Sequence, residues 1–334
     1  MIDKRIEEIA HRRERNYQAL SLIASYLNNC PDLVTREIIE EITNGEKSGE
    51  ERAFASFLAN VFSEDEAEVN WLEREYLFKS VKRLSAEEYL KNPFFEKIKI
   101  PATKEGNWDF GYQSYQPYEG FIYRDLAFTG DYVEIPQIGY FDEKFSFPTV
   151  FENGREWMAI KPNEIETMKK PIEKAKGRVL VYGLGIGYFA YMVSEKNEVD
   201  SVTVIERDEN VIKLFEKHIL PQFLNGKKIT VIKSDAFDYA KNHMKNGSFD
   251  YVFTDLWHDV SDGVDLYVKM KKHEALCPNS HFEYWIEDSI LSSIRWSIFD
   301  GIYEKAKKGD LVETFETIEK YLSDNYLKQF VKFL

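Results

Sequence analysis

The stretch "RVLVYGLGIGYFA" (residues 178–190) decides the fold of this chain. Its apolar run 179–182 is typical of a buried parallel strand, and an apolar helical run closes the stretch. Between the two stand Gly183, Gly185 and Gly187. A sharp turn from a strand into a helix, with the backbone against a ligand, needs residues without a Cβ atom. The stretch therefore predicts a ligand-binding glycine loop, although a glycine-rich turn without a ligand has the same pattern.

Strand and helix patterns alternate from this stretch onward. The expected strands are "VLVYG", "SVTVIE", "KITVIKSD", "FDYVFTD" and "SHFEYWIE", and helical runs such as "VIKLFEKHIL" separate them. Regular alternation of this kind is typical of parallel strands joined by right-handed crossovers. We expect an α/β fold with a doubly wound, mostly parallel Rossmann-like sheet.

The first half of the chain has a different character. Helical spacing of apolar residues predicts helices over 1–92, and the segment 93–155 is rich in aromatic and β-branched residues, as in a small antiparallel β element. The expected sheet occupies 156–288 and further helices occupy 289–334. Aromatic residues of the second segment either pack one face of the small sheet, which we favour, or line a substrate pocket: Trp108, Phe110, Tyr112, Tyr115 and Tyr118.

Composition limits the partners of the chain. The 334 residues include 44 Lys and Arg against 58 Asp and Glu, a net charge of -14 that repels a phosphate backbone, so bulk nucleic acid is not an expected partner. The basic run "HRRER" (residues 11–15) falls in a helical region and is expected to be a solvated helix face. Two cysteines, and no apolar run of membrane-spanning length, favour a cytoplasmic protein without a membrane partner.

Acidic residues follow the expected strands at the edge where ligands bind in such sheets. Glu206 ends the second strand, about twenty residues beyond the glycine loop, where a carboxylate can accept both ribose hydroxyls. Asp235 follows the third strand, and Asp255 follows the fourth. A dinucleotide-binding domain shares the first two features, but its G-x-G-x-x-G/A pattern meets Tyr188 at the last position, which fits poorly.

The region 171–287 resembles the core of class I S-adenosylmethionine-dependent methyltransferases, on the motifs "VLVYGLGIGYFA", "VTVIERD", "ITVIKSDAFDY" and "FDYVFTDLWHD". The resemblance implies S-adenosylmethionine as cofactor, held by the three glycines, by Glu206 at the ribose, and by Asp235 with Ala236 at the adenine. Tyr182 stands where the family often has an acidic residue, and by this position it is also expected to be a cofactor-binding residue. The β-hairpin that usually follows the fifth strand is replaced by a helical pattern, so the acceptor class does not carry over.

Two residues after the fourth expected strand are candidate catalytic groups. Asp255 is a positioner or base, and His258 is either a base or a hydrogen-bonded loop histidine. Asp255, His258 and Asp259 could together bind a divalent metal ion, but the sequence offers no further ligand nearby, and we expect no metal site. The acceptor is expected to be a small molecule or a protein, and the oligomeric state stays open.

Two rival functions remain. "FDYVFTDLWHDVSDG" is similar to the spermidine synthase region in which an Asp activates the amine, so an aminopropyltransferase is the alternative enzyme. The G-G-G-D-G-G loop and the D-x-x-D-P-x-G-P pattern of that family are absent. The third reading is a non-catalytic protein-interaction module.

Overall fold

The computed structural model describes residues 2–333 and divides them into two compact units, both discontinuous in sequence. The helical unit contains the residues up to Ala86, Ser114–Phe145 and Leu291–Gln329. The sheet unit contains Glu87–Gln113, Ser146–Ile290 and the residues from Phe330 onward. The four expected segments give the order of elements along the chain, whereas the compact units are assembled across those segments.

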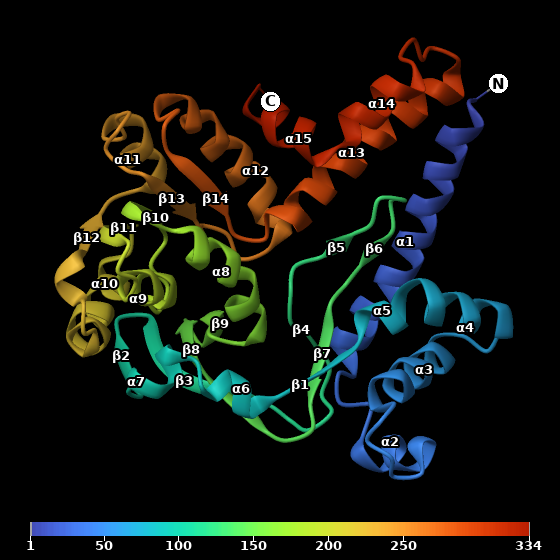
Figure 1. Ribbon diagram of the computed structural model, residues 1–334, viewed down its shortest axis with the longest axis horizontal. Helices are drawn as coiled ribbons and strands as arrows, with labels where there is room; N and C mark the ends of the chain where they lie inside the picture. The colour runs from blue at the N-terminus through green and yellow to red at the C-terminus, as the bar shows by residue number, and fades with distance from the viewer. Residues whose placement is uncertain (1, 334) are drawn as a thin grey trace. The chain divides into compact units, whose positions relative to one another are not determined.

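The sheet unit is built on one five-stranded parallel sheet, with the order β12-β11-β10-β13-β14 (Figure 1). Its strands are β10 (Gly177–Tyr182), β11 (Val199–Glu206), β12 (Ile229–Lys233), β13 (Tyr251–Thr254) and β14 (His281–Tyr284). The order reverses between β10 and β13, and the glycine loop follows β10 at that switch point, where ligands bind in open α/β sheets. The expected doubly wound sheet is confirmed.

The buried strands explain why this sheet forms. Residues 179–182 of β10 and all four residues of β13 are buried, as expected for central parallel strands covered on both faces. The crossovers contain the helices α9 (Tyr188–Ser194), α10 (Glu209–Leu214), α11 (Ala236–Asn242) and α12 (Val260–Lys271), with short π and 3₁₀ turns at Phe215–Ile219, Leu220–Gln222, Gly226–Lys228 and Lys272–Leu276. Helix α8 (Pro162–Lys174) leads into β10.

A second sheet of the same unit has the order β2-β3-β8-β9, with antiparallel pairs β2–β3 and β8–β9. Its strands are β2 (Thr103–Glu105), β3 (Trp108–Tyr115), β8 (Phe145–Glu152) and β9 (Arg155–Ala159), preceded by the short helices α6 (Ala86–Leu90) and α7 (Pro93–Lys97). Trp108 and Phe110 are buried, so they pack the sheet, whereas Tyr112 is 55% exposed. The expected small antiparallel element is present.

The helical unit contains most of the remaining elements. They are α1 (Lys4–Asn29), α2 (Arg36–Thr43), α3 (Glu50–Phe62), α4 (Glu66–Leu72), a π turn at Glu73–Leu77, α5 (Phe78–Ser80), most of α13 (Glu287–Lys308), α14 (Phe315–Leu322) and α15 (Asp324–Phe330). A 3₁₀ turn at Val331–Phe333 follows and belongs to the sheet unit. Short strands accompany them: β1 (Lys82–Leu84), β4 (Phe121–Ile122), β5 (Ala127–Phe128), β6 (Glu134–Ile135) and β7 (Ile138–Phe141). Helices from the first 86 residues and from Leu291–Gln329 thus meet in one unit.

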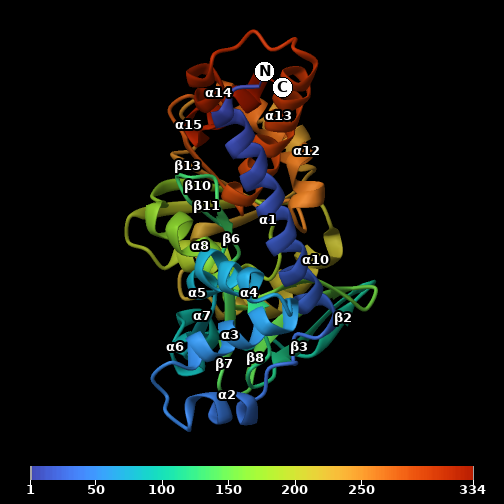
Figure 2. The ribbon, with the colours of Figure 1, turned by 90° about the vertical axis from the view of Figure 1, so that its right-hand side faces the viewer.

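Two apolar clusters stabilise the helical unit. One joins α1 to α3 and to the strand β7 through buried residues such as Phe54, whose ring stacks on Tyr140. The other joins the start of α1 to α13 and α14, through Ile6, Ile9 and Trp296 among others. Figures 1 and 2 both show α1 in blue beside the red helices α13 and α14. Helices expected separately at the two ends of the sequence therefore share one core.

The basic run at residues 11–15 is less free than a solvated helix face. Arg13 forms an ion pair with Asp300 of α13 at 2.7 Å, and the guanidinium of Arg15 lies 3.4 Å from the ring centre of Trp71. Arg12 lies 3.8 Å from Asp131. The difference arises because α13 and the loop before β6 fold back onto α1, which local helical periodicity does not reveal.

Candidate functional site

Two features of the glycine loop require glycine: positive backbone φ angles, and neighbouring atoms that leave no room for a Cβ atom. Gly183, Gly185 and Gly187 have φ angles of +94°, +52° and +82°, a region that favours glycine. A Cβ atom on Gly183 would lie 2.0 Å from the carbonyl oxygen of Asp255, and one on Gly185 would lie 2.3 Å from the thioether sulfur of Met158. At Gly187 the neighbour is the ring of Phe215, also at 2.3 Å. The close approach at this loop is thus made by the chain's own atoms.

Glu206 is held against the same loop from the end of β11. Its carboxylate accepts the backbone N–H of Leu184 at 3.2 Å and that of Asp208 at 2.8 Å. Burial raises the pKa of Glu206 above its usual range, while the backbone N–H donors lower it. A carboxylate beside the glycine loop, already ordered by two donors, is suited to accept hydroxyl groups of a ribose.

The adenine-side candidates lie at the start of α11. The carboxylate of Asp235 caps that helix, accepting the N–H groups of Phe237 and Asp238, and the side chain is otherwise exposed. Ala236, the first residue of α11, is buried. This capping fixes the chain at the carboxyl end of β12, next to the end of β11 in the sheet.

Tyr182 takes a place that the sequence does not reveal. The side chain is fully buried, and its hydroxyl donates to the sulfur of Met244 at 2.8 Å. Only its backbone reaches the loop region, where its carbonyl oxygen accepts the N–H of Asp255 at 2.9 Å. The Tyr182 hydroxyl is therefore directed at the packing around Met244.

Asp255 forms an electrostatically coupled carboxyl pair with Glu164, which lies in the first turn of α8. Burial raises the pKa of Asp255 to about 7. Burial also raises the pKa of Glu164 well above its usual range, and the charge of Asp255 raises it further. Burial thus favours the protonated form of both carboxyl groups, and raised carboxyl pKa values of this kind are frequent at functional sites.

One ion pair lies beside this carboxyl pair. The ammonium of Lys161 is 2.5 Å from the carboxylate of Glu156 on β9, and its charge lowers the pKa of Glu164, while Glu156 raises it. Because Lys161 is already paired with Glu156, it offsets little of the negative charge that Glu164 and Asp255 acquire when they ionise. Such surroundings favour a cationic ligand.

His258 lies at the rim of the same edge. Its imidazole is exposed and its ring packs edge-on against Trp157 of β9, with centroids 6.0 Å apart. Trp157 in turn packs against Trp108 at 5.8 Å. Asp259 caps α12 through the N–H of Ser261. The sequence places His258 near Asp255, and the structure adds an aromatic wall beside it.

Unpaired buried polar atoms support a ligand site at this edge. Among the residues that the structure describes, the hydroxyl of Thr254 and the indole N–H of Trp257 are buried without a hydrogen-bond partner. Both residues flank Asp255 in the sequence. The indole N–H of Trp108 is in the same state. An unpaired buried polar group costs free energy, so a polar ligand at this edge has groups to satisfy.

Two residues of the site escape the sequence patterns. Glu164 belongs to a helix that precedes the glycine loop, and Met158 belongs to an antiparallel strand. No local spacing links either residue to the ends of β10 and β13. Among the predicted residues, the structure brings Glu206, Asp255 and the glycines together, and leaves the Asp235 carboxylate on its own helix cap.

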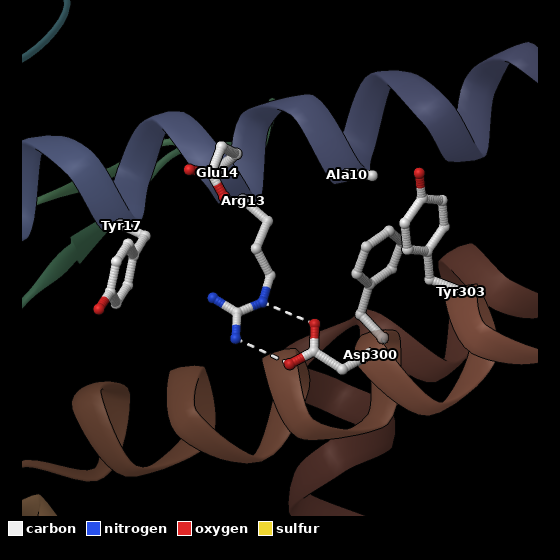
Figure 3. Close-up of a pocket in the computed structure, with 7 residues that line it drawn as sticks. Ala10, Arg13, Glu14, Tyr17, Asp300 and Tyr303 are labelled. Atoms are coloured by element: carbon white, nitrogen blue, oxygen red, sulfur yellow. Dashed lines mark hydrogen bonds and ion pairs between the residues drawn. The ribbon is translucent and has the colours of Figure 1, made fainter.

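A cavity of about 350 Å³ lies elsewhere, between α1 and α13 of the helical unit (Figure 3). Figure 3 shows the bidentate pair of Arg13 with Asp300 at its centre, and the rings of Tyr17 and Tyr303 toward its two ends. None of the residues predicted as a site lines it. Arg13 already donates two hydrogen bonds to the carboxylate of Asp300, as expected for a helix–helix contact.

Across residues 2–333, no group of three or more His, Cys, Asp or Glu side chains is arranged to hold a metal ion. Nor does any helix in the described part of the chain combine the length and the apolar character that crossing a membrane requires.

A family comparison adds one match. Residues 163–274, about a third of the chain, match the family model described as the spermine/spermidine synthase domain. The matched range begins just before Glu164 and includes the glycine loop, Glu206 and Asp255. A search of curated proteins found no match.

Solved structures match the chain only in part. Spermidine synthase from Thermotoga maritima has 15% identity and a TM-score of 0.32, over 46% of this chain and 58% of that chain. A putative O-methyltransferase from Klebsiella pneumoniae has 15% identity and a TM-score of 0.24, over 29% of this chain and 43% of that one. A putative methyltransferase from Thermoplasma acidophilum has 19% identity and a TM-score of 0.25, over 33% of this chain and 44% of that one. The chain thus spans between 43% and 58% of these structures.

The fold assignment rests on the sheet itself. The parallel order β12-β11-β10-β13-β14, the glycine loop after β10 and the match over residues 163–274 agree with one another. The sheet ends at β14, and within the described residues the chain continues as α13. The sheet unit therefore has a doubly wound, Rossmann-like α/β fold, of which residues 163–274 match the spermine/spermidine synthase domain.

Proposed function

We propose that this chain is an S-adenosylmethionine-dependent methyltransferase that alkylates an amine nitrogen of a small molecule or a protein. The observation that carries the proposal is the coupled carboxyl pair of Asp255 and Glu164 beside the glycine loop. The backbone carbonyl oxygen of Asp255 lies against Gly183, which supports a place for Asp255 beside the loop at which open α/β sheets bind ligands.

The residues expected to bind S-adenosylmethionine, the methyl donor, are only partly arranged to do so. The glycine loop would hold its amino-acid part, Glu206 its ribose hydroxyls, and Asp235 with Ala236 its adenine. Of these, the Glu206 carboxylate is ordered beside the loop, whereas the Asp235 carboxylate is engaged by its own helix. The donor supplies a methyl group on a sulfonium, which a nucleophile takes by in-line displacement.

The carboxyl pair provides what an amine acceptor needs. An alkylamine is a cation at neutral pH and has no free electron pair until it loses a proton. The carboxylate of Asp255, whose pKa burial raises to about 7, is matched to accept that proton, and the carboxyl group of Glu164 interacts with it electrostatically. The new nitrogen–carbon bond forms as the carbon–sulfur bond breaks, and the proton passes to Asp255. Exposed His258 is the second candidate base.

Aminopropyl transfer from decarboxylated S-adenosylmethionine is the second candidate function. The family match over residues 163–274 and the acidic surroundings of Asp255 favour it, because both the donor and a polyamine acceptor are cations. Against it, the loop residues Leu184 and Ile186 are buried and apolar, so the loop adds no carboxylate for a second ammonium group.

Mass spectrometry of amine acceptors distinguishes the two functions. The protein is incubated with each donor and a panel of mono-, di- and polyamines, and the products are weighed. We expect acceptors that gain a methyl group with S-adenosylmethionine. Acceptors that gain an aminopropyl group with the decarboxylated donor would establish the second function instead.

A matched pair of variants tests the role of Asp255. Asp255→Asn should retain donor binding and lose turnover by roughly a hundredfold or more. Asp265→Asn, an exposed position on α12, should behave as the wild type. Full turnover by Asp255→Asn would contradict the proposal, and binding of neither donor by the wild type would favour the protein-interaction reading.

A further inference from the structure

The side chain of Met158, on strand β9, contacts the glycine loop. The sulfur of Met158 accepts the backbone N–H of Ile186, with 3.4 Å between the two atoms. The same sulfur lies 2.3 Å from the position of a Cβ atom on Gly185, and the Cε atom of Met158 lies 3.2 Å from it. Met158 therefore fills the space next to the second glycine.

The contact between Met158 and Ile186 differs from the other hydrogen bonds of the loop in the type of acceptor. The N–H of Gly183 donates to the carbonyl of Ile205, that of Gly187 to the carbonyl of Leu184, and that of Leu184 to the Glu206 carboxylate. Each of these acceptors is an oxygen. A thioether is a weak acceptor by comparison, so among these four bonded N–H groups the N–H of Ile186 is the one that a stronger acceptor captures most readily.

The two candidate donors differ in one group that can make this exchange. S-adenosylmethionine carries a carboxylate on its amino-acid part, and the decarboxylated donor does not. A donor carboxylate is an anionic acceptor, so a backbone N–H of the loop is a favourable partner for it.

We propose that Met158 sets the choice between the two donors. Its thioether competes with a donor carboxylate for the N–H of Ile186 and for the space beside Gly185, and it leaves the decarboxylated donor unaffected. The inference rests on the proposed use of a sulfonium donor at this loop. It concerns selection of the donor, whichever of the two the wild-type protein prefers.

Titration calorimetry with both donors tests this role. In Met158→Ala, both the N–H and the adjacent space become free, so the ratio of the two dissociation constants should shift toward S-adenosylmethionine by about tenfold. Met158→Leu keeps most of the bulk without the sulfur acceptor and should shift the ratio in the same direction by less. Circular dichroism and urea unfolding check that each variant folds.

Amide hydrogen exchange provides a readout that needs no turnover. The Ile186 amide should exchange faster in Met158→Ala and Met158→Leu than in the wild type. Added S-adenosylmethionine should slow the exchange again in Met158→Ala, and the decarboxylated donor should not. Exchange that is equally fast in all three proteins would overturn the contact between Met158 and the loop.

The outcomes separate this inference from the proposed function. If the wild type binds a donor and Met158→Ala leaves the ratio unchanged, the inference is wrong and the function stands. If the wild type binds neither donor, the proposed function is wrong, and the inference is overturned with it.

Discussion

The carbonyl oxygen of Asp255 lies where a methyl group on Gly183 would have to be, 2.0 Å from that Cβ position. The N–H of Asp255 also donates to the carbonyl of Tyr182 at 2.9 Å. Backbone atoms at the end of β13 thus contact and hydrogen-bond the start of the glycine loop. A change at either residue acts on both the loop and the candidate base.

Gly183→Ala should destabilise the sheet unit. The φ angle of +94° is unfavourable for alanine, and the clash is with a backbone oxygen, which cannot rotate away. We expect a loss of on the order of 3 kcal/mol or more in the free energy of unfolding, measured with urea. Gly130→Ala is the control, because nothing lies within 4 Å of its Cβ position, and a change below about 0.5 kcal/mol is expected there. Equal stability of the two variants would contradict the close packing.

Glu206→Gln should weaken donor binding by roughly ten- to a hundredfold. Glutamine keeps the shape of the side chain but loses the charge and one acceptor oxygen, and its NH₂ group faces the N–H donors of Leu184 or Asp208. Calorimetry at matched salt concentration measures the effect. Glu209→Gln, which alters an exposed pair with Lys233, is the control and should leave the affinity unchanged. Wild-type affinity in Glu206→Gln would refute the ribose assignment.

Asp255→Asn should make the protein more stable than the wild type at pH 8, but not at pH 4. Folding raises the pKa of Asp255 from its usual value near 4 to about 7, so the folded state binds the proton more tightly than the unfolded state does. The associated stability is present below pH 4 and is lost as the pH rises through 7. Asparagine removes the cost of ionisation, and we expect a gain of roughly 1–4 kcal/mol at pH 8. Urea unfolding at both pH values measures it, and an equal effect at the two would contradict the assigned pKa.

Arg13 and Asp300 should be coupled in a double-mutant cycle of the helical unit. Their bidentate contact has two hydrogen bonds of 2.7 Å, but Asp300 is 51% exposed in its side chain. We therefore expect a coupling free energy of only about 0.5–1 kcal/mol, from the unfolding of Arg13→Ala, Asp300→Ala and the double variant. A coupling of zero would show that the pair does not hold α1 to α13.

The sheet was predictable from sequence because its signals are local. Each strand of "VLVYG", "SVTVIE" and "FDYVFTD" is a short apolar run, and the glycine spacing marks the first crossover. The right-handedness of such crossovers limits the face on which each connecting helix packs, whereas the order of the strands comes from the structure. The positions of Glu206 and Asp255 at strand ends follow from the same pattern, since the carboxyl ends of parallel strands lie at one edge.

The rest depended on contacts between residues distant in sequence. Glu164 reaches Asp255 only because α8 packs beside the ends of the central strands, and Met158 reaches Gly185 only through the folding of β9. The side chain of Tyr182 points to the face of the sheet on which Met244 lies. A motif match does not specify that direction. In the helical unit, Arg13 finds its partner in α13, almost three hundred residues along the chain.

Titration of S-adenosylmethionine into the wild-type protein tests the central claim most directly. The account predicts one site per chain, weakened in Glu206→Gln and retained in Asp255→Asn. Binding of the decarboxylated donor alone would assign the chain to aminopropyl transfer. An absence of binding by both donors, with a folded protein and at donor concentrations in the millimolar range, would contradict the account.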